Sequence, residues 1–156
     1  MNKLLVLLAT HALAVALGAA LGIYMLPILV APASPATTDV AAQASSALFQ
    51  GNFRRDLKDS DALHWGEGVV SIGSLSIGLS GQLAPGPDYK LYLSPEFVET
   101  EADFMRLKSR MIRVAEIKTF DNFLVAVPPG VDVSRFNTVV VWCETFSQFI
   151  TAAKYQ

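Results

Sequence analysis

The chain has 156 residues, which suffices for one domain of ordinary size and not for two. Hydrophobic residues make up 52% of it, and most of this excess lies before Ala31. All acidic residues and all but one of the basic residues follow Ala31, so that part is net negative. A net negative domain argues against nucleic acid as a partner, which needs a basic face, and against charge-driven binding to anionic lipid headgroups.

Cysteine and histidine are scarce. Cys143 is the single cysteine, so one chain can form neither an internal disulfide nor a four-thiolate zinc or iron–sulfur site. His11 and His64 are the two imidazoles. With so few ligands available, we predict that the chain has no metal site of its own.

Residues 1–30 are predicted to form an uncleaved transmembrane helix. From Leu4 to Val30 no side chain is charged, and a helix of this length extends over about 40 Å, more than the ~30 Å of a bilayer core. A secretory signal has a shorter apolar region, roughly 7 to 15 residues, although Ala31-Pro32-Ala33 does resemble a cleavage site. Lys3 favours a cytoplasmic N-terminus, which predicts a single-pass protein of the inner (cytoplasmic) membrane with its C-terminal domain in the periplasm or cell exterior.

Small residues recur every four positions in this helix, at Ala14, Gly18 and Gly22. Such a stripe lets two helix backbones approach closely, so it predicts a helix–helix contact and possible dimer. His11 lies on the same face, where it could form a hydrogen bond or ligate haem across the contact. The alternative is chance, because alanine and glycine are common in membrane helices.

Residues 31–48 are predicted to be a linker. They are rich in alanine, proline, serine and threonine, and Asp39 is their only charge, so they offer little to bury and should tether more than fold. A flexible tether of this length reaches about 20 to 25 Å. The outer domain can therefore rest against the membrane or a neighbour.

Residues 49–156 are predicted to form a mainly β domain, an antiparallel sandwich or barrel with one short helix. Apolar residues alternate with a period of two, which is typical of half-buried strands. This pattern occurs over residues 69–73, 75–80, 89–93, 111–117, 122–127 and 138–143, with turn residues between them. Thr100 to Asp103 resembles a capping box, so a helix should begin there and cover an opening or edge of the sheet.

Several motifs are too weak to predict chemistry. Gly66-Glu67-Gly68 lacks the third glycine of a dinucleotide fingerprint, and the aspartates at positions 56, 59 and 61 lack the glycine and glutamate of a calcium loop. The acidic residues between 96 and 103 could hold a cation, but helix capping and solvation explain them more simply. No set of nucleophile, base and orienting residue is visible, so a hydrolase is disfavoured and enzymatic activity stays uncertain.

Four local signatures remain: residues 64–68 (HWGEG), 86–94 (GPDYKLYLS), 128–132 (PPGVD) and 139–143 (VVVWC). In this order they resemble the DM-thirteen domain, also called the electron-transfer DM-thirteen family, over roughly Phe49 to the C-terminus. The resemblance implies an extracytoplasmic β domain that occurs in animals beside cytochrome-like domains, with a single cysteine proposed as a redox centre. Cys143 matches that cysteine. Because the chain has no fused cytochrome-like domain, a separate partner that carries haem or is linked to quinone would have to supply that domain.

Cys143 should share a strand face with Val139 and Val141, with Trp142 on the opposite face. One interpretation is a small, inert core residue. The other is a redox thiol that forms a mixed disulfide, a sulfenic acid or a metal thiolate. His64 and Trp65 could lie beside it and bind a cofactor together with Trp142, or they could be a strand-edge histidine and a core tryptophan.

The turn before the Tyr89 strand is predicted at Gly86-Pro87-Asp88, with Asp88 as its cap. Tyr89 and Tyr92 should then fall on opposite strand faces, where one of them could line a binding surface. Taken together, the sequence favours a membrane-anchored, extracytoplasmic redox or electron-transfer accessory domain that uses Cys143. The alternative is a non-catalytic binding module of the cell envelope in which Cys143 is structural.

Overall fold

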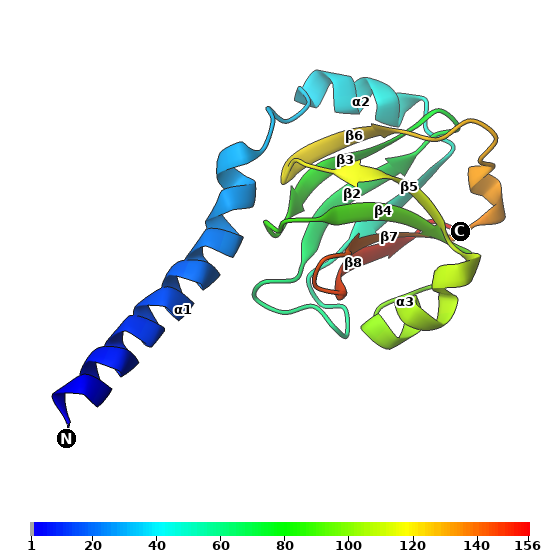
Figure 1. The fold of residues 1–156 in the computed structure, drawn as a ribbon. Helices are drawn as coiled ribbons and strands as arrows, with labels where there is room; N and C mark the ends of the chain where they lie inside the picture. The colour runs from blue at the N-terminus through cyan, green and yellow to red at the C-terminus, as the bar shows by residue number, and fades with distance from the viewer. Residues whose placement is uncertain (1) are drawn as a thin grey trace.

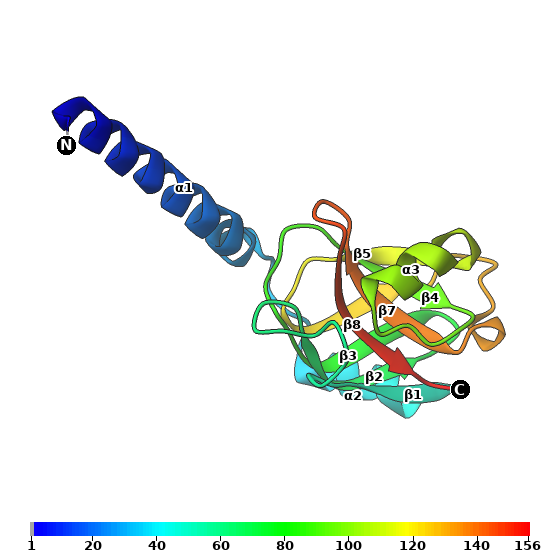
Figure 2. The same ribbon diagram turned by 90° about the horizontal axis from the view of Figure 1, so that it is seen from below.

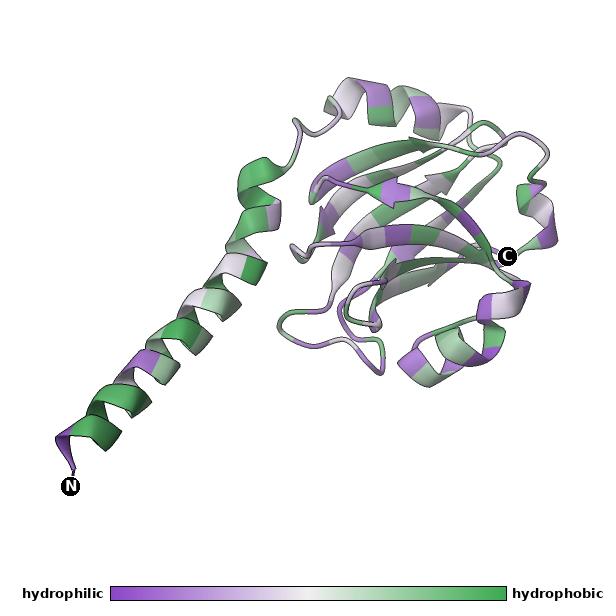
Figure 3. Ribbon diagram, in the orientation of Figure 1, coloured by the Kyte–Doolittle hydropathy of each residue, from purple (hydrophilic) through white to green (hydrophobic). Residues whose placement is uncertain are grey.

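The computed structural model describes residues 2–156, as a long helix followed by a β-sandwich (Figure 1). Helix α1 (Lys3–Val30) extends away from the sandwich, as the two perpendicular views show (Figures 1 and 2). It is apolar along most of its length (Figure 3), and none of its residues is buried. The Asn2 side chain caps its start by accepting a hydrogen bond from the Leu4 amide at 3.3 Å. The helix is long and apolar enough to cross a membrane.

A second helix, α2 (Thr37–Ser45), lies within the segment for which the sequence predicts an unstructured tether. It packs on one face of the sandwich, where Val40 is buried. The Gln43 amide also donates hydrogen bonds to the carbonyl oxygens of Ser71 at 3.1 Å and Ser76 at 3.0 Å. The expectation that this stretch does not fold is therefore wrong for residues 37–45, because one buried valine and one glutamine anchor it to the sheet.

The first sheet has the strand order β1-β2-β3-β6, and the second has the order β5-β4-β7-β8, with antiparallel pairing throughout the described residues. The strands of the first sheet are β1 (Phe49–Phe53), β2 (Gly66–Ile72), β3 (Ser76–Leu83) and β6 (Asp121–Ala126). Those of the second are β4 (Tyr89–Ser94), β5 (Ile112–Ile117), β7 (Thr138–Cys143) and β8 (Gln148–Lys154). The predicted antiparallel sandwich is confirmed.

Helix α3 (Glu101–Leu107) begins where the capping-box pattern predicts it, since the Thr100 hydroxyl accepts a hydrogen bond from the Asp103 amide at 3.0 Å. It continues into the 3₁₀ turn η1 (Lys108–Arg110), and a second such turn, η2 (Val133–Arg135), precedes β7. Instead of closing an edge or opening, α3 covers the outer face of the second sheet (Figures 1 and 2). The outer face of the second sheet is apolar, so α3 packs on this face to bury it and not on an edge.

The buried side chains form two clusters that share the second sheet. The inner cluster fills the space between the two sheets, and it includes Val139, Val141 and Cys143 from β7. The outer cluster lies between the second sheet and α3, and it includes Val140 and Trp142 from the same strand. Strand β7 is thus buried on both faces, and the predicted alternation around Cys143 is confirmed.

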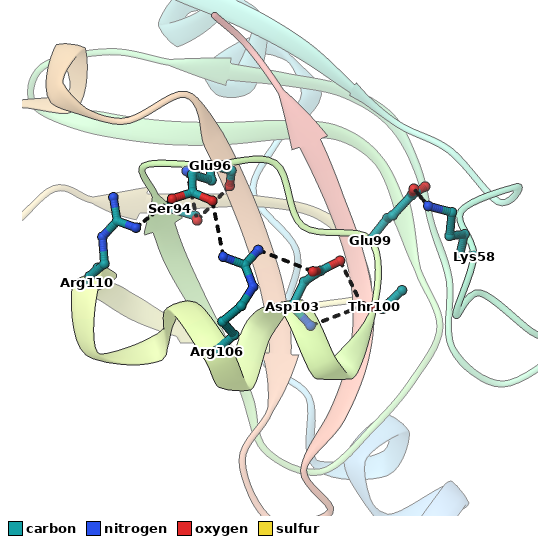
Figure 4. Close-up of polar contacts among 8 residues, drawn as sticks. All are labelled: Lys58, Ser94, Glu96, Glu99, Thr100, Asp103, Arg106 and Arg110. Atoms are coloured by element: carbon teal, nitrogen blue, oxygen red, sulfur yellow. Dashed lines mark hydrogen bonds and ion pairs between the residues drawn. The ribbon is translucent and has the colours of Figure 1, made fainter.

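Ion pairs surround α3 on the outside (Figure 4). Glu96 accepts from Arg106 at 3.2 Å and from Arg110 at 2.5 Å, and Arg106 also pairs with Asp103 at 3.3 Å. Glu99 pairs with Lys58 at 2.5 Å. Three of the acidic residues that a cation could have used, Glu96, Glu99 and Asp103, are thus engaged in ion pairs, and Asp103 also accepts a hydrogen bond from the Thr100 hydroxyl at the start of α3.

Candidate functional site

The inner cluster ends in a cavity of about 510 Å³ beside α1, which we call the Cys143 cavity. Its walls come from four strand residues of the second sheet, from three loops and from the part of α1 around residues 20–24. The lining residues are Ala20, Ile23, Tyr24, Leu63, His64, Pro85, Gly86, Pro87, Tyr89, Cys143, Phe146, Gln148 and Ile150. Among the described residues, none that lines it is a lysine, arginine, aspartate or glutamate. The cavity is therefore an apolar space with a few polar groups.

Cys143 is the last residue of β7 and is 2% exposed, so the cavity is its route to the outside. Burial raises the pKa of the Cys143 thiol, because an ionised sulfur would lose its hydration. The backbone amides of Phe146 and Asp88 partly oppose this shift. At neutral pH the side chain is thus a protonated thiol, which is a weak hydrogen-bond donor and a poor nucleophile.

Asp88 of the Gly-Pro-Asp signature fixes the backbone that follows Cys143. Its carbonyl oxygen accepts a hydrogen bond from the Glu144 amide at 3.0 Å, and its carboxylate accepts one from the Thr145 hydroxyl at 2.9 Å. Lys90 pairs with the same carboxylate at 2.8 Å, and this hydrogen bond lowers the pKa of Asp88. The sequence predicts that Asp88 caps its own turn. In the structure Asp88 instead joins that turn to the β7–β8 turn.

Tyr89 forms the floor of the cavity beside Cys143. A side-chain carbon at position 86 would overlap the Tyr89 ring, so only glycine there lets the ring lie flat against the turn. The ring also meets Phe120 edge-on, with centroids 6.1 Å apart. Burial raises the pKa of Tyr89. Its hydroxyl makes no hydrogen bond within residues 2–156 and is not one of the fully buried unpaired polar atoms, so it is open to a ligand in the cavity.

His64 lies at the rim of the cavity, with 27% of its side chain exposed. Its Nδ1 is 2.9 Å from a carboxylate oxygen of Asp61, and the other Asp61 oxygen accepts from the amides of Leu63 and His64 at 2.7 and 2.8 Å. The hydrogen bond to His64 is the largest cause that lowers the pKa of Asp61. Asp61 therefore orients the imidazole, and two of the four candidate residues, His64 and Cys143, share one cavity.

The two tryptophans lie elsewhere. The Trp65 ring lies under the Arg55 guanidinium, 3.3 Å from it, outside the cavity lining. Trp142 points to the opposite side of β7 and stacks on Phe104 at 3.9 Å between ring centroids. Its indole nitrogen is buried without a hydrogen-bond partner. The structure thus does not bring either tryptophan to Cys143.

Two side chains at the cavity could ligate an iron or another metal, the Cys143 thiol and the His64 imidazole. Within residues 2–156 no three histidine, cysteine, aspartate or glutamate side chains gather as a metal site requires. Leu63, Phe146 and Ile150 also line the cavity, but the sequence does not mark them, because apolar side chains in a wall carry no motif. Tyr89 is one of the two tyrosines for which the sequence predicts a place on a binding surface.

These features define a class of protein: a two-sheet antiparallel domain that follows an apolar helix able to span a membrane. A family model described as Electron transfer DM13 matches residues 53–155, which is most of the sandwich. The chain therefore belongs to this DM13 electron-transfer family, as the four local signatures predict. Comparisons with curated proteins and with solved structures give no match.

Proposed function

We propose that this protein is an electron-transfer accessory protein of the cell envelope. Helix α1 anchors it as a single-pass protein of the inner (cytoplasmic) membrane, and residues 31–48 connect the anchor to the domain of residues 49–156 in the periplasm or cell exterior. Cys143 is the group through which this domain exchanges electrons with a partner in the same membrane. The family supports a general electron-transfer role, and the roles of α1 and Cys143 are our extension of it.

One observation carries the assignment to Cys143. The thiol lies at the inner end of an apolar cavity, and one wall of that cavity is the part of α1 around Ile23 and Tyr24. A redox group of a membrane partner can therefore reach this end of the sandwich without leaving the neighbourhood of the bilayer. His64 at the rim adds a group that can donate or accept a proton as electrons move.

The chemistry of a single thiol limits the mechanism. A disulfide within the chain would need a second cysteine, and the chain has none. We propose that a thiol of the partner supplies it: the two sulfurs form a mixed disulfide, and two electrons and two protons pass to the redox group of that partner. A haem-containing or quinone-linked membrane protein has the required acceptor.

The test is to follow the redox state of Cys143 in native membranes. Membranes carrying the full chain are either aerated or supplied with a respiratory donor, then quenched in acid, unfolded and labelled with a maleimide that adds mass. We expect the labelled fraction to rise in the reduced membranes, and Cys143→Ala to show no added mass under either condition. A thiol that stays fully labelled under both conditions would refute the redox role.

A second candidate function is a non-catalytic binding module, and the burial of Cys143 favours it. The side chain is 2% exposed and its thiol pKa is raised, which is usual for an inert core cysteine. Under this alternative, Cys143→Ala lowers stability by a few kcal/mol at most and leaves partner binding intact. Capture of the membrane partner by the Cys143→Ala variant, with unchanged yield, would therefore favour the binding module.

A dimer through α1 is a further part of the proposal. Around Gly18 and Gly22 there is open space, so the stripe that also includes Ala14 is free to meet a second helix. The test is crosslinking of the full chain in membranes. Gly18→Leu should abolish the crosslinked dimer, whereas Leu17→Ile on another face should leave it.

A further inference from the structure

The position of the Cys143 cavity along α1 places its opening at a membrane boundary. This step rests on the proposed function, because it assumes that α1 crosses the bilayer. A bilayer core takes about 20 helical residues, so a span that starts after Lys3 leaves the core near Ile23. Tyr24 follows, and tyrosine is enriched at such boundaries. Because Ala20, Ile23 and Tyr24 line the cavity, its mouth lies at the level of the outer leaflet.

Two exposed apolar side chains of the domain also lie at the level of the outer leaflet. Leu63 is 58% exposed and Phe146 is 47% exposed, and both line the cavity from loops outside the sheets. Large exposed apolar side chains are costly in water, but they are stable in the interfacial region of a bilayer. The loops around residues 63 and 146 lie beside the upper half of α1 (Figure 1). These two loops can therefore insert into the outer leaflet, so that the cavity opens to the lipid phase.

The lining of the cavity selects the chemistry of an occupant. Its volume of about 510 Å³ lies within the ~300–1,000 Å³ of small-molecule sites. No lysine or arginine among the described lining residues can neutralise a phosphate or a carboxylate, so a charged head group would lose its hydration without compensation. The polar groups of the lining are the Tyr24 and Tyr89 hydroxyls, the His64 imidazole, the Gln148 amide and the Cys143 thiol. Tyr89 and Cys143 are the two that are buried. Both are protonated donors, because burial raises their pKa values.

We propose that the Cys143 cavity binds an uncharged, membrane-dissolved molecule with an apolar tail and a carbonyl group, which enters from the outer leaflet. The carbonyl oxygen accepts a hydrogen bond from the otherwise unpaired Tyr89 hydroxyl at the floor. The tail lies along the apolar wall toward Ile23 and Phe146. Phospholipids are disfavoured as occupants, because the described lining residues include no lysine or arginine to neutralise a phosphate.

The test uses the full chain in phosphatidylcholine nanodiscs with a decyl-tailed benzoquinone that carries a photoreactive diazirine on its tail. Labelled peptides are located by mass spectrometry. We expect saturable labelling of peptides that contain residues 63–64, 85–89 or 143–150, and loss of this labelling when unmodified decyl-benzoquinone is in excess. Labelling confined to α1, or labelling that does not saturate, would mean that the probe only samples lipid-exposed surface, and it would overturn the proposal.

Two variants and a control sharpen the test. Gln148→Trp fills the cavity from the start of β8 and should reduce labelling at least tenfold. Gln50→Trp places the same side chain on the exposed face of β1, away from the cavity, and should leave labelling unchanged. Tyr89→Phe removes one hydrogen bond and should weaken binding by roughly 3- to 10-fold. Equal labelling of Gln148→Trp and Gln50→Trp would contradict the proposal.

Both the ester carbonyl of a phospholipid and the ketone carbonyl of a quinone could accept the hydrogen bond from Tyr89. A comparison with a phospholipid probe separates these two sources. A diazirine-bearing phosphatidylcholine should fail to label the cavity peptides. If it labels them and decyl-benzoquinone does not compete, the occupant is a phospholipid and the proposal is wrong. None of these readouts depends on the redox state of Cys143. A failure of ligand binding would therefore not affect the outcome of the mixed-disulfide test, and an inert thiol would not affect the outcome of the binding test.

Discussion

The inner and outer clusters of the sandwich contain similar side chains, but they end in different ways. The outer cluster is closed: α3 covers it, the Phe104 and Trp142 rings stack inside it, and ion pairs surround the helix (Figure 4). The inner cluster is closed along most of its length and ends in the Cys143 cavity. Residues 142 and 143 are neighbours in the chain, yet one belongs to each cluster. The closed region accounts for stability, and the open region is where a function can reside.

The largest effect should come from the closed region. Trp142→Ala removes a side chain that is 1% exposed and stacked on Phe104, and this should lower the free energy of unfolding by about 3–5 kcal/mol. Leu63→Ala, at the cavity mouth, should change it by less than about 0.5 kcal/mol. Both values come from urea denaturation of the full chain in detergent. Similar losses for the two variants would refute the contrast between the clusters.

The next effect tests how Gly86 shapes the cavity floor. Gly86→Ala would push a carbon into the Tyr89 ring, and overpacking of this kind should cost about 1–3 kcal/mol. The same substitution in a Tyr89→Leu background should cost less, because the ring that it meets is gone. Denaturation curves of the four proteins in this double-mutant cycle measure the coupling between positions 86 and 89. An equal cost in both backgrounds would place the strain in the backbone of the turn.

The pH dependence of stability offers a smaller effect with a definite sign. Burial raises the pKa values of Cys143 and Tyr155, so the folded state favours their neutral forms. Their contributions are fully present below the unfolded-state values, about 8.5 for cysteine and 10 for tyrosine, and are lost as pH rises further. Stability should therefore begin to fall above about pH 8.5, and Cys143→Ala should delay that fall toward pH 10. If Cys143→Ala does not delay the fall in stability, the thiol ionises freely in the folded protein.

The smallest effect concerns the ion pairs around α3. Glu96 faces Arg106 and Arg110, but all three side chains are largely exposed, so solvent and salt screen the pairs. Glu96→Gln should lower the melting temperature only slightly at low salt and not measurably in 1 M NaCl. A large loss that persists in high salt would show that the closure of the outer cluster depends on charge more than on packing.

The sequence predicts the fold more fully than the site. Six strands follow from period-two alternation, and α3 follows from the Thr100 cap. Strand β1 escapes detection because FQGNF is short and has a glycine at its central inward position, and β8 escapes because QFITAAK does not alternate. Helix α2 escapes because one buried valine is too weak a signal. For the site, the sequence predicts that Cys143 shares a strand face with Val139 and Val141. It cannot show that His64 and Tyr89 surround the same cavity, because that proximity depends on how three loops meet.

The most direct test of the central claim is thiol labelling of the full chain in nanodiscs, with a neutral maleimide and a charged methanethiosulfonate compared across pH 6 to 9. If Cys143 is reached only through the apolar cavity, N-ethylmaleimide should label it slowly in the folded protein and the charged reagent should not. Gln148→Trp should then block labelling by N-ethylmaleimide. Both reagents should react rapidly after unfolding. Fast labelling by the charged reagent at neutral pH would contradict the account, and so would a complete lack of labelling by either reagent before unfolding.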